Sequence, residues 1–385
     1  MRIAFFVQYA DLNGTYFRWH NLAKALQIQG HIIDVYAGDH NWKSQVREEI
    51  RDGVQYYIIP ALQTARIFYS PNDPFSAWRR MLKLPGKEYD VYHLFQPFLQ
   101  AYLPWKWLKR KRKKAVFIYD WDDLWTDGLY TKATSLRFSY MFFITKQLER
   151  KIPIKADGVT VCSQFLANKI EDFVVAKKIY NGFWPAIVPH KEEMRIKWKL
   201  DKGIFYLGYV GKTADELDWI VDGLNYLYEK GISCVKLIVC GPPRNFMEKS
   251  GFIKNENIVY LGEVKPTEAK EIACAVDLGM IPLEDNLFNQ SRFPIKFFDF
   301  LTVNTPIYLS DVGEISIIGK ELPAVYIGPT KKDLWIIELK NVVESLKTKP
   351  QVNNIDGLIS NFSWPSISED LITFYNQILG HKNRT

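Results

Sequence analysis

Cysteine and histidine are scarce in this chain, with 4 and 6 of them among 385 residues. The cysteines show neither a CxxC pair nor the spacing of a zinc site, and three lie in apolar runs: Cys162, Cys234, Cys240 and Cys274. A disulfide framework and a cysteine metal site are therefore not expected. We expect buried free thiols and a reducing compartment.

Long apolar runs are also missing. No window offers ~20 uncharged apolar residues, the length of helix that crosses a bilayer. The first residues, Met1–Val7, indicate a short strand rather than a signal peptide, because polar Gln8 follows at once. These absences predict a cytoplasmic protein without a membrane-spanning helix.

The glycine patterns of two familiar nucleotide-binding loops are absent. No GxGxxG follows the first strand of either half of the chain, which argues against a dinucleotide-dependent oxidoreductase. Gly211-Lys-Thr213 looks like the end of a P-loop, but Tyr206 holds the position of that loop's first glycine. The backbone cradle that defines a P-loop is therefore missing.

What is present is an ordinary globular composition, with 47% hydrophobic and 24% charged residues. The length exceeds one comfortable core, so two domains are expected. Aromatic residues make up 15% of the chain, including 12 Trp. Most of them are expected in large cores, and others would suit carbohydrate stacking or a membrane interface.

Apolar strand patterns alternate with amphipathic helix patterns, which predicts an α/β fold with parallel sheets covered on both faces. Strands are expected at 3–7, 32–37, 54–59, 91–95, 115–119 and 158–162, and again at 205–210, 235–239, 258–261, 278–282, 307–309 and 325–327. Residues 184–202, which contain Pro185 and Pro189, resemble a linker. We therefore predict two doubly wound parallel-sheet domains, 1–186 and 187–363, with a C-terminal helix, 364–385, that completes the first.

The stretch Asn289–Leu301 stands out in the second half. Polar residues open it, Pro294 suits a first helical turn, and apolar residues then recur at helical spacing. Arg292 and Lys296 would add positive charge to the helix N-terminus, with Asp299 three residues on. This pattern indicates either a site for a phosphate-bearing ligand or a core helix with solvated charges.

Ligands of open α/β sheets bind outside the carboxyl ends of the strands. Residues just after the predicted strands are therefore candidates for a site: Asn13, Gly14, Thr15, His93, Asp120 to Asp123, Asn181, Gly182, Gly211, Lys212, Gly241, Glu284, Asp285 and the opening of Asn289–Leu301. With two domains facing each other, these edges would line one cleft.

Five segments resemble, in their order and spacing, those of glycosyltransferases of the GT-B fold, most closely the retaining group called family 4. They are Gly14 with the run from Arg18 to Tyr36, Asp90–Leu94, Ala156–Ser163 leading to Tyr180–Gly182, Tyr209–Lys212, and Arg292–Glu314. Each segment is weak alone, but together they span nearly the whole chain. The resemblance implies two Rossmann-like domains facing a cleft, retention of anomeric configuration, no cofactor and no divalent ion.

The resemblance also implies a role for each matching residue. A nucleotide diphosphate-sugar would bind the second domain through Gly211, Lys212, Gly241, Asn289, Ser291, Arg292, Pro294, Ile295, Lys296 and Asp299, and an acceptor would bind the first through Asn13, Gly14, Thr15, Asp122 and Asp123. Asp299 stands at the second acidic position of the family's E-x7-E motif, where a carboxylate accepts hydrogen bonds from ribose hydroxyls. The cations Lys212, Arg292 and Lys296 would stabilise the departing diphosphate, and His93 and Asp122 complete the predicted catalytic set.

Two positions depart from the family pattern. The first acid of E-x7-E falls on Ser291, which leaves open how the sugar hydroxyls are held; Asn289 or Arg292 would compensate. The family's second basic residue after Lys212 falls near Asp218, which cannot bind phosphate. Arg292 and Lys296 would supply the missing charge.

Two candidate sites in the first domain each have more than one possible role. Asp120-Trp-Asp-Asp123 could be the metal-binding DxD of the other glycosyltransferase fold, but two parallel units favour GT-B. Asp122 or Asp123 would then face the acceptor or cap a loop. His93 would either face the cleft or be a satisfied structural histidine, and Phe95 could occupy the cleft position instead.

The run Lys106–Lys114 holds seven cations among nine residues and follows Trp105. An anionic membrane attracts such a run at ~1 kcal/mol per basic residue. Nucleic acid would attract it too, and a solvated helix face is the plain alternative. Lipid-linked acceptors are common in the family, so we expect peripheral contact with the inner face of a membrane and no nucleic acid.

Together these patterns predict a hexosyltransferase-type enzyme of glycan biosynthesis that uses a nucleotide-sugar donor and a glycan or lipid-linked acceptor. Two alternatives stay open. A nucleotide-sugar epimerase would want a denser set of carboxylates and histidines than this chain shows. A catalytically silent GT-B-fold partner or glycan-binding subunit is favoured by Ser291.

Overall fold

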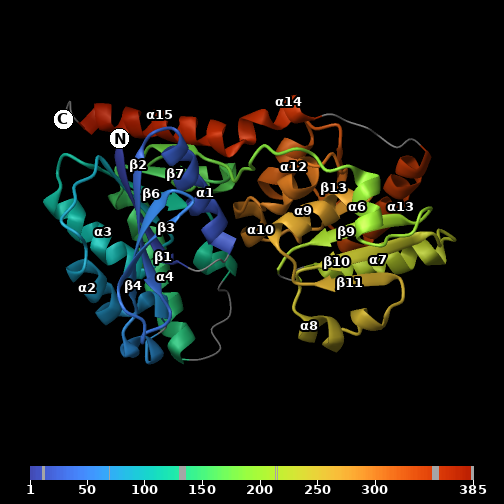
Figure 1. Ribbon diagram of the computed structural model, residues 1–385, viewed down its shortest axis with the longest axis horizontal. Helices are drawn as coiled ribbons and strands as arrows, with labels where there is room; N and C mark the ends of the chain where they lie inside the picture. Colours follow the sequence, from blue (N-terminus) through green and yellow to red (C-terminus); the bar gives the residue numbers. More distant parts are fainter. Residues whose placement is uncertain are drawn as a thin grey trace. The chain divides into compact units, whose positions relative to one another are not determined.

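The computed structural model describes residues 1–10, 14–68, 70–129, 136–212, 214, 216–348 and 355–382. The chain forms two compact units, each built around one sheet (Figure 1). Unit 1 comprises Met1–Gly182 and Phe362–Thr385, and unit 2 comprises Phe183–Asn361.

The sheet of unit 1 has eight strands in the order β3-β4-β2-β1-β5-β6-β7-β8. They are β1 (Arg2–Tyr9), β2 (Ile32–Asp39), β3 (Arg47–Arg51), β4 (Val54–Pro60), β5 (Val91–Phe95), β6 (Val116–Trp121), β7 (Gly158–Val161) and β8 (Ala176–Lys178). Every pair is parallel except β3 with β4. All residues of β5, β6 and β7 are buried, as expected for central strands covered on both faces. The chain order reverses around β1, so the predicted doubly wound topology is confirmed.

Strand β3 was not expected from the sequence. Four of its five residues are charged, so it has no apolar run. It forms a hairpin with β4 through Asp52 and Gly53, whose φ angles are 48° and 81°. Positive φ at both turn residues is the signature of a tight hairpin turn. A short, charged edge strand also resists pairing with another chain.

The helices of unit 1 are α1 (Gly14–Ile28), α2 (Pro74–Leu82), α3 (Leu99–Lys111), α4 (Leu136–Lys155), α5 (Gln164–Ala167) and α15 (Trp364–Lys382), with short turns η1 (Gln63–Arg66), η2 (Ser70–Asn72) and η3 (Trp125–Leu129). Helix α15 lies along unit 1 and packs against α1 and β6 (Figure 1). Its apolar stripe, including Leu371, Phe374 and Tyr375, is buried there. The C-terminal segment is thus part of the core of unit 1.

The sheet of unit 2 has six parallel strands in the order β11-β10-β9-β12-β13-β14. They are β9 (Phe205–Val210), β10 (Val235–Cys240), β11 (Ile258–Gly262), β12 (Leu278–Ile281), β13 (Ile307–Ser310) and β14 (Val325–Gly328). Helices are α6 (Lys191–Lys197), α7 (Leu217–Glu229), α8 (Arg244–Lys249), α9 (Pro266–Ala275), α10 (Leu287–Ser291), α11 (Lys296–Leu301), α12 (Gly313–Gly319), α13 (Lys332–Thr348) and α14 (Asp356–Ile359), with turns η4 (Phe252–Lys254) and η5 (Ser360–Phe362).

The two faces of β9 show how this sheet is covered. Leu207 and Tyr209 join one hydrophobic cluster with α7 and α13. Gly208 points the other way, and a Cβ there would lie 2.8 Å from Val276 at the end of α9. Helices α9 and α11 pack together on that second face. Helices therefore cover both faces of the unit 2 sheet at β9.

Two expectations from the sequence are corrected, one about residues 184–202 and one about the cysteines. Residues 184–202 are not a plain linker, because they contain α6, whose Arg195 pairs with Asp277 at 2.5 Å and donates to the carbonyl of Ala275. Mixed charge in this segment therefore serves to anchor it to unit 2. Three of the four free cysteines are buried as expected, but Cys234 is exposed.

Candidate active site

The carboxyl edge of the unit 2 sheet brings two glycine turns together. Gly211 follows β9, and Gly241 follows β10 with φ of 106°. A Cβ on Gly241 would lie 2.3 Å from the carbonyl oxygen of Gly211, so only glycine fits there. Lys212 comes next in the chain and is exposed at this edge. Backbone and cation are thus both presented where ligands of such sheets bind.

The segment expected as one helix from Asn289 is two helices, α10 and α11. Asn286 caps α10 by accepting from the N–H of Asn289 at 2.9 Å, and Arg292 is extended with φ −95° and ψ 163°. Pro294 causes the break, because it lacks an N–H and disfavours helical backbone at the preceding residue. Pro294 and Ile295 lead into α11, which starts at Lys296. Since α11 has only six residues, its side chains rather than its dipole supply the charge.

Lys296 and Asp299 lie three residues apart on α11, beside the ends of β9 and β10. The Lys296 ammonium is 5.1 Å from the centre of the Tyr209 ring in β9. Burial raises the pKa of Asp299 to about 6, although Lys270 and Lys296 oppose that shift. Burial and the nearby charge of Asp299 also raise the pKa of Cys240, the last residue of β10, to about 12. A cation and a half-buried carboxyl therefore share one spot on the sheet edge.

Lys270 of α9 belongs to this group although sequence reasoning missed it. It is half-buried, and burial lowers its pKa while Asp299 raises it. The residue lies 29 positions before Asp299, in a helix of ordinary composition. Only the packing of α9 against α11 brings the two together, and no motif signals it.

Asn289 is held in a buried polar network rather than facing outward. Its side-chain nitrogen donates to Glu216 Oε1 at 2.9 Å and to the carbonyl of Glu284 at 2.8 Å. Glu216 itself has φ of 53°, a left-handed conformation that costs free energy in a non-glycine residue. Sequence analysis did not single out Glu216, and its place directly before α7 is the only local signal.

Three buried polar atoms of this network have no hydrogen-bond partner within the described part of the chain: Glu216 Oε2, Asn289 Oδ1 and Arg292 Nε. Buried polar atoms are normally paired, so these are the ones that a ligand or water would satisfy. The Arg292 guanidinium also lies 4.5 Å from the centre of the Phe288 ring. Two hydrogen-bond acceptor atoms and one cationic hydrogen-bond donor thus lie in α10 or next to it.

Ser291 does not fit the donor-binding role expected for it. It is fully buried, and its hydroxyl donates to the carbonyl of Phe288 one turn back at 2.8 Å. Ser291 is the last residue of α10, and its side chain is bonded to the backbone of that helix. Asp218, at the other departure from the family pattern, forms an ion pair with Lys332.

At the carboxyl edge of unit 1, the structure describes all but one of the expected acceptor-binding residues. Asn13 lies outside the described residues. Gly14 is the first residue of α1, and the hydroxyl of Thr15 accepts from Gln96 Nε2 at 2.8 Å. Gln96 directly follows β5 with φ of 70°, another left-handed residue at a strand end. Sequence reasoning missed Gln96, although a polar residue before Pro97 at a strand end is a usable signal.

Asp120 cannot take part in a metal-binding DxD, because Arg18 occupies it. The Arg18 guanidinium donates to both carboxylate oxygens at 2.7 and 2.8 Å, and Thr160 donates to Oδ1 at 2.5 Å. Burial would raise the pKa of Asp120, but Arg18 outweighs that effect and holds it below its usual range. Both side chains are buried.

His93 is a buried structural histidine, and the catalytic role expected for it is corrected. It lies in the middle of β5, not at its end, with no exposed surface. Its Nδ1 bonds the Tyr375 hydroxyl at 2.6 Å, and its Nε2 contacts Thr160 at 3.3 Å. Burial lowers its pKa to about 3 despite the nearby charge of Asp120, so the ring is neutral.

Asp122 is the carboxyl group at this edge best suited to proton chemistry. Burial and the charges of Asp123 and Asp120 raise its pKa well above the usual value. Its buried Oδ1 has no hydrogen-bond partner within the residues described. Asp123, next in the chain, is half-buried. A carboxyl that stays protonated can donate as well as accept a hydrogen bond.

The loop that carries Asp122 is positioned by Glu149 of α4, which sequence analysis missed. The Glu149 carboxylate accepts from the Trp121 indole at 3.0 Å and from the backbone of Trp125 and Thr126 at 2.7 and 3.0 Å. Glu149 is itself buried. One buried acid thus fixes both ends of the turn that contains Asp122 and Asp123.

Comparisons with known proteins agree with this architecture. Residues 13–183 match the sequence model of Glycosyltransferase Family 4. Over 333 residues the chain is 21% identical to TuaH of Bacillus subtilis (strain 168), named as a teichuronic acid biosynthesis glycosyltransferase, with 80% of each chain covered.

Solved structures extend the likeness in fold to the whole chain. Sucrose-phosphate synthase from Thermosynechococcus elongatus has a TM-score of 0.72 at 14% identity, covering 99% of this chain and 100% of that one. Anabaena HepE, solved with UDP and glucose, has a TM-score of 0.70 at 11% identity, covering 98% and 100%. WaaG, a glycosyltransferase of lipopolysaccharide biosynthesis, has 0.69 at 13%, covering 96% and 98%. The chain is a glycosyltransferase of the GT-B type, as the sequence predicted.

Two further findings bear on its surroundings. No helix in the described part of the chain is long and apolar enough to cross a membrane. Over the same residues, no group of three or more His, Cys, Asp and Glu side chains is arranged to hold a metal ion.

Proposed function

We propose that this enzyme moves a sugar from a nucleoside diphosphate sugar to a glycan or lipid-linked acceptor, with retention at the anomeric carbon and without a metal ion. The donor binds at the carboxyl edge of the unit 2 sheet, and the acceptor at that of unit 1. The observation that carries the proposal is the neighbourhood of Lys296 and Asp299 beside the ends of β9 and β10. A cation for the diphosphate and a carboxylate for ribose hydroxyls are what such a donor requires.

The diphosphate is held by charge. Lys212 and Lys296 carry ammonium groups at this edge, and Arg292 offers an Nε donor with no partner in the described chain. Negative charge builds on the departing phosphate as the glycosidic bond breaks, and prearranged cations stabilise it most in that state. Gly211 and Gly241 bring two backbone turns into close contact at this edge, and the phosphates approach the backbone there.

The sugar and the ribose of the donor are held by oxygen atoms of the protein that accept hydrogen bonds. Asp299 takes the ribose hydroxyls, and the free oxygens of Asn289 and Glu216 replace the acid missing at Ser291. A hydroxyl that donates to a buried, otherwise unpaired oxygen recovers that atom's desolvation cost. The HepE structure with UDP and glucose supports a donor of this class.

The acceptor binds among Gly14, Thr15, Asp122 and Asp123, where Asp122 orients the attacking hydroxyl. The names of TuaH and WaaG, from teichuronic acid and lipopolysaccharide biosynthesis, support a cell-envelope glycan or lipid-linked acceptor. Attraction of the basic run Lys106–Lys114 to an anionic membrane would bring the enzyme to such an acceptor. Arg110, Lys111, Lys113 and Lys114 of this run are exposed.

The test of the donor site is a thermal-shift screen of nucleoside diphosphates and nucleotide-sugars at millimolar concentration. The melting temperature of the wild type should rise by several degrees with the nucleotides of one base, and the Asp299→Ala and Lys296→Ala variants should not show that rise. Lys254→Ala, which removes an exposed lysine of η4, is the matched control and should keep it. A wild type that no nucleotide stabilises would refute the donor site.

Products then separate the remaining functions. Proton NMR of the anomeric signal should show a product with the configuration of the donor, formed equally with and without chelator. Binding without transfer to any envelope acceptor would favour a silent partner subunit, and a donor that returns with an inverted ring hydroxyl would mean an epimerase. Sedimentation with anionic liposomes tests the membrane contact, which should weaken when Lys109 to Lys114 are neutralised.

A further inference from the structure

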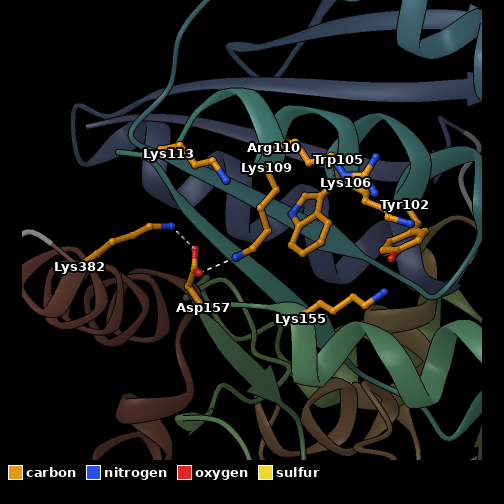
Figure 2. Close-up of a pocket in the computed structure, with 9 residues that line it drawn as sticks. All are labelled: Tyr102, Trp105, Lys106, Lys109, Arg110, Lys113, Lys155, Asp157 and Lys382. Carbon is orange, nitrogen blue, oxygen red and sulfur yellow. Dashed lines mark hydrogen bonds and ion pairs between the residues drawn. The ribbon is translucent and has the colours of Figure 1, made fainter. Parts of the chain in front are cut away.

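Four of the seven cations of the basic run, Lys106, Lys109, Arg110 and Lys113, line a pocket rather than a flat face (Figure 2). Its volume is about 480 Å³, and its walls are Tyr102, Trp105, Lys106, Lys109, Arg110, Lys113, Lys155, Asp157 and Lys382. Three separate elements, α3, α4 and α15, contribute cations to it. The pocket therefore depends on the folded unit 1 and not on one helix.

The single carboxylate of the pocket is already occupied. Asp157 Oδ1 bonds Lys109 at 2.5 Å, and its Oδ2 bonds Lys382 at 2.7 Å (Figure 2). Oδ2 also accepts from the backbone N–H of Phe117 at 2.8 Å. Burial would raise the pKa of Asp157, but the two lysines hold it below its usual range. Asp157 thus holds Lys109 and Lys382 in place, and its single negative charge does not neutralise the other cations of the pocket.

The remaining four cations have no countercharge. Within the residues described, Lys106, Arg110, Lys113 and Lys155 form no ion pair with a carboxylate. Burial first, and then the charges of Lys155 and Arg110, lower the pKa of Lys106. Like charges held together in this way repel, and an anion would relieve the repulsion.

The shape of the pocket suits a compact anion. Trp105 is fully buried, and its indole donates to the carbonyl of Tyr92 at 3.0 Å, so this wall is rigid. Lysines act as mobile point charges that can converge on one phosphate. The amphipathic walls of Tyr102 and Trp105 would accommodate the group that carries it.

The pocket lies at the starting edge of the unit 1 sheet. Lys113 precedes β6, and Asp157 directly precedes β7. The acceptor residues Asp122 and Asp123 follow β6, which has six residues. At about 3.3 Å per residue, roughly 20 Å separates the two edges. The pocket is therefore a different site from the one proposed for the acceptor.

We propose that this pocket binds a phosphate-bearing group of at least two negative charges, which Lys106, Lys113 and Lys155 contact above the Lys109–Asp157–Lys382 base. The site lies wholly in unit 1 and does not depend on the donor assignment. The phosphate can come free in solution or as the headgroup of a lipid.

Isothermal titration with inorganic pyrophosphate tests the site. The variant Lys106→Gln/Lys155→Gln removes two cations without leaving a carboxylate unpaired, and it should bind at least tenfold more weakly. Lys83→Gln/Lys169→Gln is the matched control, because it removes the same charge from exposed positions elsewhere in unit 1. Lys296→Ala/Asp299→Ala removes binding at the proposed donor site, so the two contributions are separated. Lys113→Gln, a single exposed change, serves as a second test that keeps the fold.

Loss in the pocket variants that persists in the Lys296→Ala/Asp299→Ala background supports the proposal. Equal affinity of the pocket variant and its charge-matched control would overturn it, as would binding that only the donor-site variant removes. Competition with pyrophosphate by phosphatidic acid vesicles, whose phosphomonoester headgroup can carry two negative charges, would identify a lipid headgroup as the source, and no competition would identify free phosphate.

Discussion

Arg18 of α1 and Asp120 of β6 form a buried bidentate ion pair, with N–O distances of 2.7 and 2.8 Å. The same guanidinium donates to Asn181 and to the carbonyl of Ile179 at 3.1 and 2.8 Å. One side chain therefore joins the first helix of unit 1 to its central strand and to the end of its first chain segment. The pair lies near the carboxyl edge of the sheet, but its polar atoms bond each other and are not available to a ligand.

We expect Arg18→Met to lower the free energy of unfolding of unit 1 by about 3–5 kcal/mol, because it leaves Asp120 buried and unpaired. Lys340→Ala, which breaks the half-exposed pair with Glu344, should cost at most about 0.5 kcal/mol. Urea unfolding followed by circular dichroism measures both. Similar losses in the two variants would mean that Asp120 is neutralised in another way.

The raised pKa of Asp299 predicts a stability that falls as pH rises. Its folded pKa of about 6 exceeds the ordinary aspartate pKa of 3.8, so over this interval the folded state keeps a proton that the unfolded state has lost. The stabilising effect is present below about pH 4 and is lost as pH passes 6. Asp299→Asn should therefore stabilise unit 2 at pH 7.5 by about 1–3 kcal/mol and hardly at all at pH 4. Denaturant titrations at both pH values test this, and equal effects would contradict the shift.

The architecture was accessible from sequence because each central strand is a short apolar run between helical patterns. The rule that ligands bind at the carboxyl ends then directed attention to the sheet edge that carries Gly211, Gly241, Lys296 and Asp299. Strand β3 was missed because its charged residues carry no apolar pattern. Only pairing with β4 makes it a strand.

The contents of the site were less accessible. His93 lies in a strand buried on both faces, where alternation cannot distinguish an inward side chain from one at the edge. Lys270 of α9 and Glu216, directly before α7, come from segments remote in sequence, and only packing brings them to this sheet edge. Ser291 matched a motif position by number, but it is buried in the last turn of α10, where its hydroxyl bonds the carbonyl of Phe288.

Binding of the nucleotide should follow the ionisation of Asp299. A ribose hydroxyl donates to the carboxylate but gains less from the protonated acid, so affinity should fall by about tenfold between pH 7 and pH 5. The phosphates of the ligand titrate in the same range, and Asp299→Asn provides the control because it keeps their contribution alone. The difference between the two pH profiles, measured by titration calorimetry, should have a midpoint near 6, the value expected for Asp299. Superimposable profiles would remove Asp299 from the ribose site.

Glu149 offers a test of positioning, since it touches no proposed ligand. Its carboxylate bonds the backbone N–H groups of Trp125 and Thr126, and a Gln in its place has one acceptor oxygen fewer. We expect Glu149→Gln to cost about 1.5–3 kcal/mol and to speed hydrogen exchange of these two amides at least tenfold. Glu344→Gln on the surface of α13 is the matched control. In transfer assays the loosened turn at Asp122 should raise KM for the acceptor and leave KM for the donor unchanged. A loss confined to stability, with both KM values unaltered, would show that the turn does not position the acceptor.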